Sequence, residues 1–229
     1  MAKFHFIEDY ERLVRRLMWK YSLDEAMSRA VGGGGYEQIG QIEAAIVGYA
    51  GLRDGQSLVD LGCGSGRLAS ALGQQMSIEY CGIDVVKALL KYAKKKSPEN
   101  YRFILNRSLR VPLPDASADM ATAFSVFTHL LHHESYIYLE ELRRVVRPGG
   151  MVVFSFLEFS EPSHWSQFEA TVEVQRSATL PHLNQFLERS QIEWWSDKLG
   201  YEGVRFVDSS AAPWGTSGAL GQSIAILQR

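Results

Sequence analysis

The segment Val59-Asp60-Leu61-Gly62-Cys63-Gly64-Ser65-Gly66 constrains the fold of this chain more than any other segment. An apolar run with strand character ends in Asp60 and passes directly into alternating glycines, and the residues after them have the pattern of a helix. Glycine lacks a Cβ and tolerates positive φ, so such a loop lets the backbone approach a polar ligand at a helix start. The segment therefore predicts a strand, a tight ligand-binding turn and a helix.

Short apolar runs alternate with amphipathic stretches from about residue 55 onward. The expected strands are Ser57–Leu61, Ile78–Ile83, Tyr101–Leu105, Met120–Phe124, Met151–Leu157, Tyr201–Asp208 and Gln222–Leu227. The expected helices are Leu68–Met76, Val85–Lys96, Glu134–Val146 and Leu183–Leu199. Alternation of this kind requires right-handed crossovers and a parallel sheet with helices on both faces. The expected fold is a three-layer, Rossmann-like α/β fold: a seven-stranded, mostly parallel sheet with an antiparallel last strand.

A run of glycines separates the N-terminal part of the chain from the rest. Tyr10, Leu13 and Leu17 are spaced as one apolar face of a helix, and Gly32–Gly35 follows. Each glycine costs a helix about 1 kcal/mol relative to alanine, so this run is either a disordered connector or a hinge. We expect residues 1–40 to form a helical cap or lid with a glycine hinge, and residues 41–229 to form the core. Residues 158–182 are an insertion on the substrate side.

Charge and cysteine content limit the class of partner. The formal charge of −2 and a pI near 6.3 give no general attraction for polyanions, so we expect neither nucleic acid nor a membrane as partner. The two cysteines form no disulfide framework, and the first residues lack the apolar run of a signal peptide. These features favour a cytoplasmic protein that is a monomer or homodimer. The lysines from Lys87 to Lys96 are expected to form a solvated helix face.

The glycine turn is also compatible with a second interpretation, that of a dinucleotide-binding site. Gly64-Ser65-Gly66-Arg67-Leu68-Ala69 approximates the dinucleotide fingerprint, and Asp84 lies at the expected distance downstream. Asp60 opposes this reading, because a carboxylate beside the turn would repel a pyrophosphate and attract an ammonium group. The predicted antiparallel hairpin at the end of the chain also replaces a second nucleotide-binding half.

Four landmarks in order resemble the class I S-adenosylmethionine-dependent methyltransferases, within their small-molecule (type 11-like) branch. The landmarks are Val59 to Gly66, Gly82-Ile83-Asp84, Leu113-Pro114-Asp115 before Ser117-Ala118-Asp119, and Arg144-Val145-Val146-Arg147-Pro148-Gly149-Gly150. The resemblance covers residues 40 to 229. It implies S-adenosyl-L-methionine as the cofactor and a small-molecule methyl acceptor.

The same resemblance implies a set of cofactor-binding residues. Asp60 would lie near the ammonium group, Asp84 would accept both ribose hydroxyls, and Val85 would line the adenine. Arg107 stands where an acid is common in this family, so Asn106 or Ser108 would accept from the adenine amine. The full expected set is Asp60, Gly62, Cys63, Gly64, Gly66, Asp84, Val85, Ser108, Leu109 and Ser125.

The segment after the fourth expected strand would form the floor beneath the sulfonium and the acceptor side. His129 is the expected catalytic base, because a histidine can accept a proton near neutrality. His129, His132 and His133 have a spacing that would place them on one helical face, but no fourth ligand is evident and we expect no metal. Trp165 and Trp214 are expected to contact the substrate, and Trp194 and Trp195 to pack in the core.

The predicted function is methyl transfer from S-adenosylmethionine to oxygen or nitrogen of a small molecule, for instance a sugar or natural-product acceptor. A non-catalytic S-adenosylmethionine-binding regulator or partner protein is the alternative. A nicotinamide-dinucleotide oxidoreductase is the third hypothesis.

Overall fold

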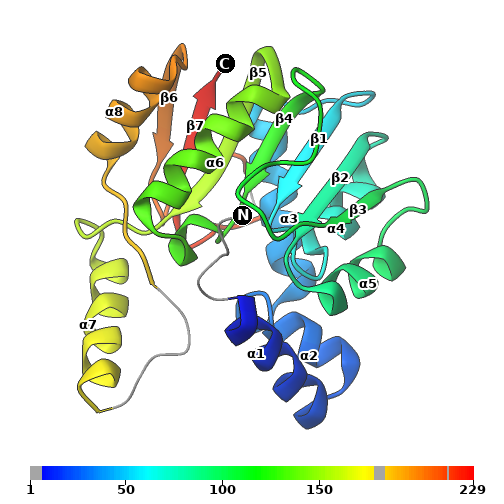
Figure 1. The fold of residues 1–229 in the computed structure, drawn as a ribbon, viewed down its shortest axis with the longest axis vertical. Helices are drawn as coiled ribbons and strands as arrows, with labels where there is room; N and C mark the ends of the chain where they lie inside the picture. The colour runs from blue at the N-terminus through cyan, green and yellow to red at the C-terminus, as the bar shows by residue number, and fades with distance from the viewer. Residues whose placement is uncertain (1–6, 178–183, 216) are drawn as a thin grey trace.

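The computed structural model describes residues 7–177, 184–215 and 217–229, and Figure 1 shows a central sheet with helices on both faces. The sheet order is β3-β2-β1-β4-β5-β7-β6. The strands are β1 (Ser57–Leu61), β2 (Glu79–Asp84), β3 (Arg102–Leu105), β4 (Ala118–Ala123), β5 (Val146–Phe156), β6 (Gly203–Val207) and β7 (Ser223–Gln228). All neighbouring pairs are parallel except those of β7, which runs antiparallel to β5 and β6. The predicted fold is confirmed.

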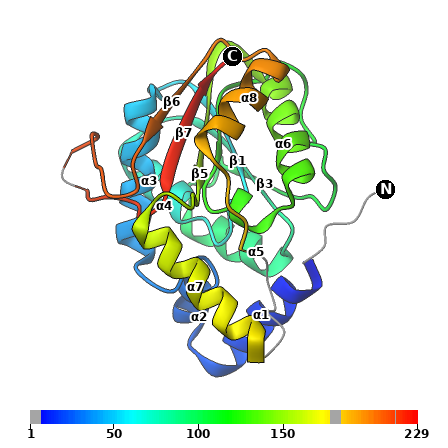
Figure 2. The same ribbon diagram turned by 90° about the vertical axis from the view of Figure 1, so that its left-hand side faces the viewer.

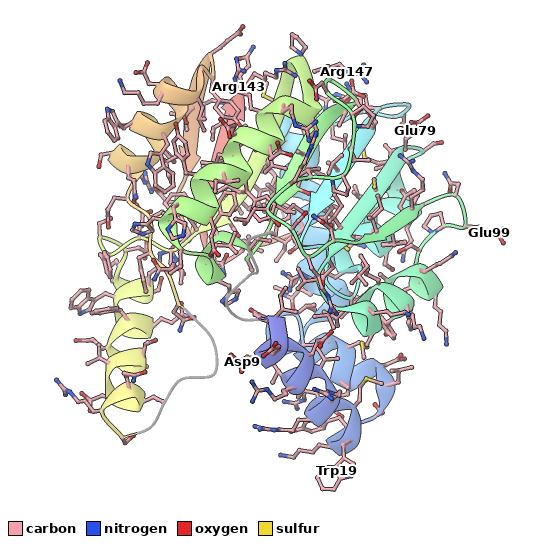
Figure 3. All side chains as sticks on the ribbon, in the orientation of Figure 1. Asp9, Trp19, Glu79, Glu99, Arg143 and Arg147 are labelled. Carbon is pink, nitrogen blue, oxygen red and sulfur yellow. The ribbon has the colours of Figure 1, made fainter. Side chains whose placement is uncertain are left out.

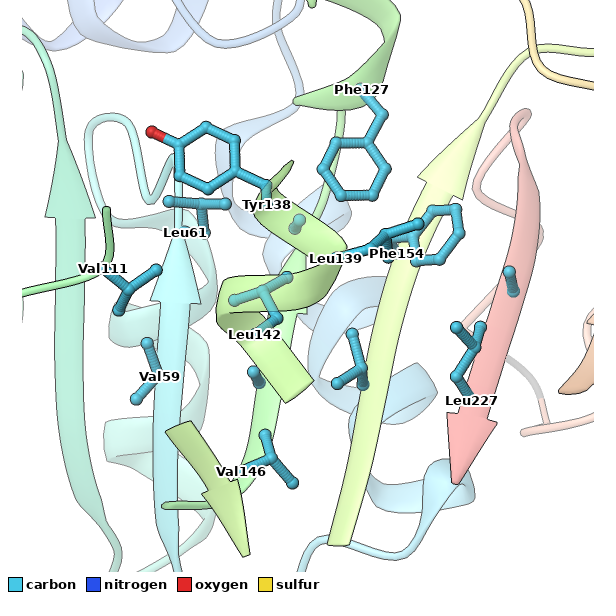
Figure 4. Packing of buried hydrophobic residues seen from close by; sticks show 14 of the residues in the cluster. Val59, Leu61, Val111, Phe127, Tyr138, Leu139, Leu142, Val146, Phe154 and Leu227 are labelled. Carbon is cyan, nitrogen blue, oxygen red and sulfur yellow. The ribbon is translucent and has the colours of Figure 1, made fainter. Parts of the chain in front are cut away.

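Two apolar clusters hold the helices against the sheet. On one face, α3 (Tyr36–Ala50) and α4 (Arg67–Gln75) pack on β1, β4 and β5. On the other face lie α6 (His132–Val145) and α8 (Arg189–Leu199). Leu139 and Leu142 of α6 are fully buried, and Figure 4 shows them between Val59 of β1 and Phe154 of β5. The helix α5 (Lys87–Lys96) connects β2 to β3.

Three helices project beyond the carboxyl ends of the parallel strands. The cap helices α1 (Ile7–Lys20) and α2 (Leu23–Arg29) lie at one side of this end, and α7 (Pro162–Ser177) lies at the other, as the two views show (Figures 1 and 2). Trp19 is 89% exposed at the tip of the cap (Figure 3). No described helix is both long and apolar enough to cross a membrane.

The glycine run Gly32–Gly35 lies between α2 and α3, and all its residues have positive φ. The helix α3 then runs from Tyr36 to Ala50, across the expected boundary between residues 40 and 41. Gly40 on this helix approaches α4 so closely that a Cβ would lie 2.5 Å from the carbonyl oxygen of Arg67. The break in the chain therefore falls at the glycines, and α3 packs as part of the core.

Three expected elements differ from the structure for identifiable reasons. The expected helix from Leu183 begins only at Arg189; the backbone before it is extended, because Gln185 donates to the carbonyl of Thr128 and Leu187 to that of Leu157. Residues 178–183 lie outside the described part. The insertion contains α7, which a periodicity search misses because His164 is its one buried residue among those described. The strand β5 starts at residue 146 instead of 151, through a bulged pairing with β4.

Candidate active site

A cavity of about 540 Å³ opens at the carboxyl ends of β1, β2, β4 and β5, between the cap and α7. This is the edge at which open α/β sheets bind ligands. Of the expected site residues it is lined by Asp60, Gly62, Cys63, Gly64, Asp84, Val85, Ser125 and His129. The roles assigned to these residues stay predictions, but the fold does bring them to one cavity.

The glycine turn is enclosed by the protein on the side away from the cavity. Gly62 and Gly64 have φ of 70° and 55°. A Cβ on Gly62 would lie 2.4 Å from Val126 Cγ2, and one on Gly64 would lie 2.5 Å from Val31 Cγ1. The glycines are therefore required both by backbone conformation and by packing against the segment after β4 and against the cap. Their backbone remains on the cavity side.

Gly66 and Cys63 of the glycine turn are both buried. Gly66 does not line the cavity; its φ is 82°, and a Cβ there would lie 2.6 Å from the Cβ of Ala93 on α5. It lets α4 begin against α5. Cys63 is buried, and burial raises the pKa of its thiol well above the usual value. The thiol is therefore neutral.

Asp84 connects the ends of β1 and β2. Its carboxylate accepts from the N–H of Gly64 at 2.9 Å and from the N–H of Val86 at 2.8 Å. Burial raises the pKa of Asp84 to about 6, although the hydrogen bonds from Val86 and Gly64 oppose this shift. Each oxygen keeps a lone pair, so the carboxylate can still accept from a ligand hydroxyl.

Asp60 is more deeply buried than expected for a ligand-binding carboxylate, with 3% of its surface exposed. It accepts from the hydroxyl of Tyr80 at 2.5 Å and from that of Thr122 at 2.9 Å. Burial is the main cause that raises its pKa to about 7. Asp60 thus presents a hydrogen-bonded carboxyl group whose charge at neutral pH is sensitive to a nearby cation.

Ser108 and Leu109 are not among the residues that line the cavity, and their expected role at the adenine stays a prediction. Leu109 packs against the core beneath α6, and the carbonyl of Ser108 accepts from Tyr138. Asn106 does line the cavity, but its amide donates to the carbonyls of Ser108 and Arg110, and its Oδ1 accepts from Ser108. These bonds close the loop around Asn106, so its side chain is not free to accept from an adenine amine.

Arg107 stands where an acidic residue is common in the family, and it makes contacts that an acid could not make. Its Nε donates to the carbonyl of Val85 at 3.1 Å, and its guanidinium pairs with Glu11 on α1. A basic residue here therefore links the end of β2 to the cap. No one position in the sequence indicates this contact, because Glu11 is 96 residues away.

The buried pair of Arg67 and Glu43 is a part of the site that sequence reasoning missed. Glu43 on α3 is 2% exposed and lies 2.6 Å from the guanidinium of Arg67 on α4. Arg67 also donates to the carbonyl of Val31 in the cap segment. Both side chains line the cavity. The only available signal was the position of Arg67 directly after the glycine turn.

The cap contacts the glycine turn and the predicted catalytic residue. Ser65 donates through its hydroxyl to the carbonyl of Met27 at 3.0 Å, and Tyr36 donates to the carbonyl of Ser65 at 2.9 Å. The ring of Tyr10 meets that of His129 edge-on, with centroids 5.5 Å apart. Burial, with a smaller contribution from nearby Asp84, raises the pKa of Tyr10. The cap therefore forms one wall of the cavity.

The three histidines do not share a helical face. His129 lies in the single turn η1 (Phe127–His129), and α6 starts at His132. His132 instead contacts the carbonyl of Phe186 through Nε2 at 3.1 Å. Among the described residues, no group of three or more histidine, cysteine or acidic side chains could hold a metal ion.

The tryptophan assignments need correction at three of four positions. Trp195 is buried as expected, but Trp194 is 64% exposed. Trp165 packs against Phe159 and Phe168, and Trp214 meets Tyr49 and donates to a loop carbonyl. Neither Trp165 nor Trp214 lines the cavity. On the side of β4, β5 and α7, the cavity is lined by residues that include Gln167, Asn184, Gln222, Thr128 and Leu157.

The donor set fits S-adenosylmethionine. This cofactor carries an amino-acid part, a sulfonium, a ribose and an adenine. The backbone of the glycine turn, the carboxyl groups of Asp60 and Asp84, and the apolar Val85 and Leu89 line one cavity. Arg29 at the end of α2 lines it too, and its guanidinium pairs with Glu25 at 2.9 Å.

Comparison with known proteins agrees with this fit. Residues 59–154 match the methyltransferase-domain family Methyltransf_11. Malonyl-[acyl-carrier protein] O-methyltransferase of Serratia marcescens is 28% identical over 177 residues, covering 76% of this chain and 65% of the relative. A ubiquinone/menaquinone biosynthesis C-methyltransferase of Cupriavidus necator is 28% identical over 151 residues, covering 61% and 57%. The chain thus spans less than two thirds of the length of these relatives.

Solved structures show the same fold at low sequence identity. A methyltransferase from Thermotoga maritima has a TM-score of 0.65 at 17% identity, covering 98% of this chain and 99% of that one. One from Archaeoglobus fulgidus has a TM-score of 0.62 at 12% identity, covering 86% and 95%. In its glycine turn, its sheet order and the family match over residues 59–154, the chain is similar to the class I S-adenosylmethionine-dependent methyltransferases.

Proposed function

We propose that this protein transfers a methyl group from S-adenosylmethionine to an oxygen atom of an uncharged small molecule. The observation that carries the proposal is the uneven distribution of charge in the cavity. All its charged carboxylate and guanidinium side chains lie in the cap or on the β1–β2 side: Arg29, Glu43, Asp60, Arg67 and Asp84. Among the described residues, the part at the ends of β4, β5 and β7 presents amides, hydroxyls, apolar groups and the imidazole of His129. An uncharged acceptor suits this second part.

Bound S-adenosylmethionine would supply an electrophilic methyl group on its sulfonium. The residues of this chain supply position and exclusion of water, which are sufficient for much of the rate of an in-line displacement. The apolar side chains of Ile7, Leu13 and Leu157 enclose the cavity. His129 lines the same cavity, beside Ser125 and Thr128, and would accept the proton of a hydroxyl acceptor.

Carbon is the second candidate for the acceptor atom. The Cupriavidus necator relative is named as a C-methyltransferase, and a demethylmenaquinone methyltransferase of Staphylococcus aureus is 34% identical over 118 residues. The part of the cavity at the ends of β4, β5 and β7 would also accept a reduced quinone. A malonyl thioester carries a carboxylate, and among the described residues of this part there is no lysine or arginine to bind it.

The test combines cofactor binding with turnover. Calorimetry with S-adenosylmethionine, S-adenosylhomocysteine and NAD should show binding of the first two only, and preference for NAD would overturn the proposal. Turnover should then be measured on a reduced naphthoquinone, a malonyl thioester, a phenol, an amine and a sugar, with the methylated atom identified by NMR. Cofactor binding without turnover on any compound would favour the non-catalytic alternative.

His129→Gln tests the proton acceptor. With an oxygen acceptor we expect kcat to fall by about 100-fold or more, since general bases contribute about 10²–10⁴. Cofactor affinity should be unchanged. A rate equal to that of the wild type across the pH range would remove His129 from the mechanism. Tyr10→Phe, which keeps the ring that meets His129, is the matched control for packing.

A further inference from the structure

Ser125 has an unusual backbone conformation at the floor of the cavity. Its φ is 55°, in the left-handed region that a serine rarely occupies, and Phe124 separates it from the end of β4. Two hydrogen bonds hold it there: its N–H donates to the hydroxyl of Ser155 at 2.7 Å, and its carbonyl accepts from Thr128 at 3.2 Å. Backbone strain that the surrounding structure maintains in this way is concentrated at functional sites.

The hydrogen bonds of Ser125 and Ser155 continue to Gln222. Ser155 is fully buried; it accepts from Ser125 and donates through its hydroxyl to Oε1 of Gln222 at 2.6 Å. The hydroxyl of Ser125 donates to the same oxygen at 3.3 Å. Within the described residues, the side-chain hydrogen bonds of Gln222 all end on Oε1. The two hydrogens on Nε2 therefore have no acceptor in this part of the chain, and the orientation of the amide is set.

Gln222 lies just before β7 and lines the cavity. It is on the β4–β5–β7 side of the sheet, whereas the glycine turn and Asp84 are on the β1–β2 side. The oriented amide thus faces the part of the cavity that the proposed function gives to the methyl acceptor. An N–H donor in a partly buried cavity selects for an oxygen that accepts and selects against an ammonium, which only donates.

We propose that Gln222 is a specificity-determining residue, whose Nε2 amide donates to a carbonyl or phenolic oxygen of an uncharged methyl acceptor. This inference rests on the proposed function. The Ser125–Ser155 network acts through Gln222 as a positioning network: it fixes Oε1 and so aims Nε2. Asn184 and Gln167 line the same side but take no part in this network, so they lack this orientation.

The test is a binding cycle that removes the oxygen from the ligand and the amide from the protein. The probes are 1-tetralone and tetralin, which differ by the carbonyl oxygen. Their affinities are measured by NMR titration on protein saturated with S-adenosylhomocysteine. Wild-type protein should bind 1-tetralone about three- to tenfold more tightly than tetralin, as one hydrogen bond between neutral groups predicts. Gln222→Met should abolish this preference and leave tetralin binding unchanged.

The control variant is Gln167→Met, which removes the same type of side chain from the same side of the cavity and should keep the preference for 1-tetralone. Ser155→Ala should reduce the preference without removing the donor. If Gln222→Met keeps the preference, or if wild-type protein binds neither probe or both equally, the inference is overturned. Cofactor affinity is measured in parallel: normal S-adenosylmethionine binding with any of these results leaves the proposed function standing, while its loss in the wild type overturns that function.

Discussion

The two halves of the cavity differ in how far the protein satisfies its own polar groups. On the β1–β2 side, Asp60 and Asp84 each accept two hydrogen bonds from the protein, and Asn106 is saturated by its own loop. On the β4–β7 side, Gln222 presents an oriented amide whose Nε2 has no acceptor among the described residues. The comparison shows a preorganised half that suits one constant ligand and a half with open hydrogen-bonding capacity that suits a variable one.

The cap belongs to the preorganised half. Its segments contact the glycine turn through Met27 and Val31, and Tyr36 at the start of α3 adds a hydrogen bond to the carbonyl of Ser65. The helix α7, in contrast, contributes to the acceptor half with few buried residues. Changes in the first half should therefore affect folding and cofactor binding together, and changes in the second half should affect acceptor binding alone.

The largest expected effect is that of Gly66→Ala. The substitution combines a φ of 82°, strained for alanine, with a Cβ 2.6 Å from that of Ala93 and 2.9 Å from its Cα. Strain and overpacking together should lower the free energy of unfolding by about 2–6 kcal/mol. Gly55→Ala is the matched control, because its φ is 79° but nothing lies within 4 Å of the new Cβ. Chemical denaturation that showed equal losses would contradict the packing argument.

Arg67→Leu should have the second-largest effect on the free energy of unfolding. It leaves Glu43 buried without its partner, and breaking a buried ion pair costs about 3–5 kcal/mol. Loss of the bond to Val31 should also weaken S-adenosylmethionine binding. Arg176→Leu is the control, because Arg176 and its partner Glu173 are 69% and 68% exposed and should contribute about 0–1 kcal/mol. Thermal melts of both variants, with and without cofactor, check the difference.

Asp84→Ala should weaken S-adenosylmethionine binding by about 1.5–3 kcal/mol, the range for hydrogen bonds to a charged group. Asp197→Ala, on the surface of α8, is the calorimetric control. Acidification provides a second check. Protonation of Asp84, with its pKa near 6, removes the charge that accepts from ribose, so affinity should fall as the pH drops from about 8 to about 5.

The contribution of Asp60 and Asp84 to the free energy of unfolding of the cofactor-free protein should increase as the pH falls. The pKa values of Asp60 and Asp84 are about 7 and about 6 in the folded state, against 3.8 for ordinary aspartate. The folded state thus binds these protons more tightly, and the two groups favour folding most below pH 3.8. That contribution is lost as the pH rises through 6 and 7. Asp60→Asn and Asp84→Asn should each flatten the profile; an unchanged profile in both would refute the assignment.

The smallest expected effect is that of Arg107→Ala. Arg107 and Glu11 are 45% and 33% exposed, so their ion pair should contribute about 0–1 kcal/mol to cap closure and should weaken with salt. We expect a slight loss of cofactor affinity at low ionic strength. Lys95→Ala on α5 is a control for the change in net charge alone. A loss greater than that of Asp84→Ala would show that the cap, and not the glycine turn, dominates binding.

The alternation of strands and helices, the mostly parallel sheet and the glycine turn could be predicted because they depend on local patterns. The residues from Val59 to Gly66 predict their own local conformation. An apolar strand is followed by positions whose φ only glycine readily adopts. Element ends were less accurate, since residues 184–188 follow long-range hydrogen bonds to Thr128 and Leu157 in place of their helical pattern.

Some residues expected at the site do not line the cavity, because their surroundings depend on distant partners. Ser108 and Leu109 lie close in sequence to Asn106, yet contacts with Tyr138 and α6 turn them away from the cavity. Trp165 and Trp214 pack against aromatic residues and do not line the cavity.

The amino-acid sequence by itself determined the sheet, the glycine turn and the two carboxylates after β1 and β2, because periodicity and glycine content act within a few residues. Only the tertiary structure decided that Glu43 faces Arg67, that Arg107 reaches Glu11, and that two serines orient Gln222. Each of these contacts joins residues between 24 and 97 positions apart. Their geometry is set by how the layers pack, and no local pattern records it.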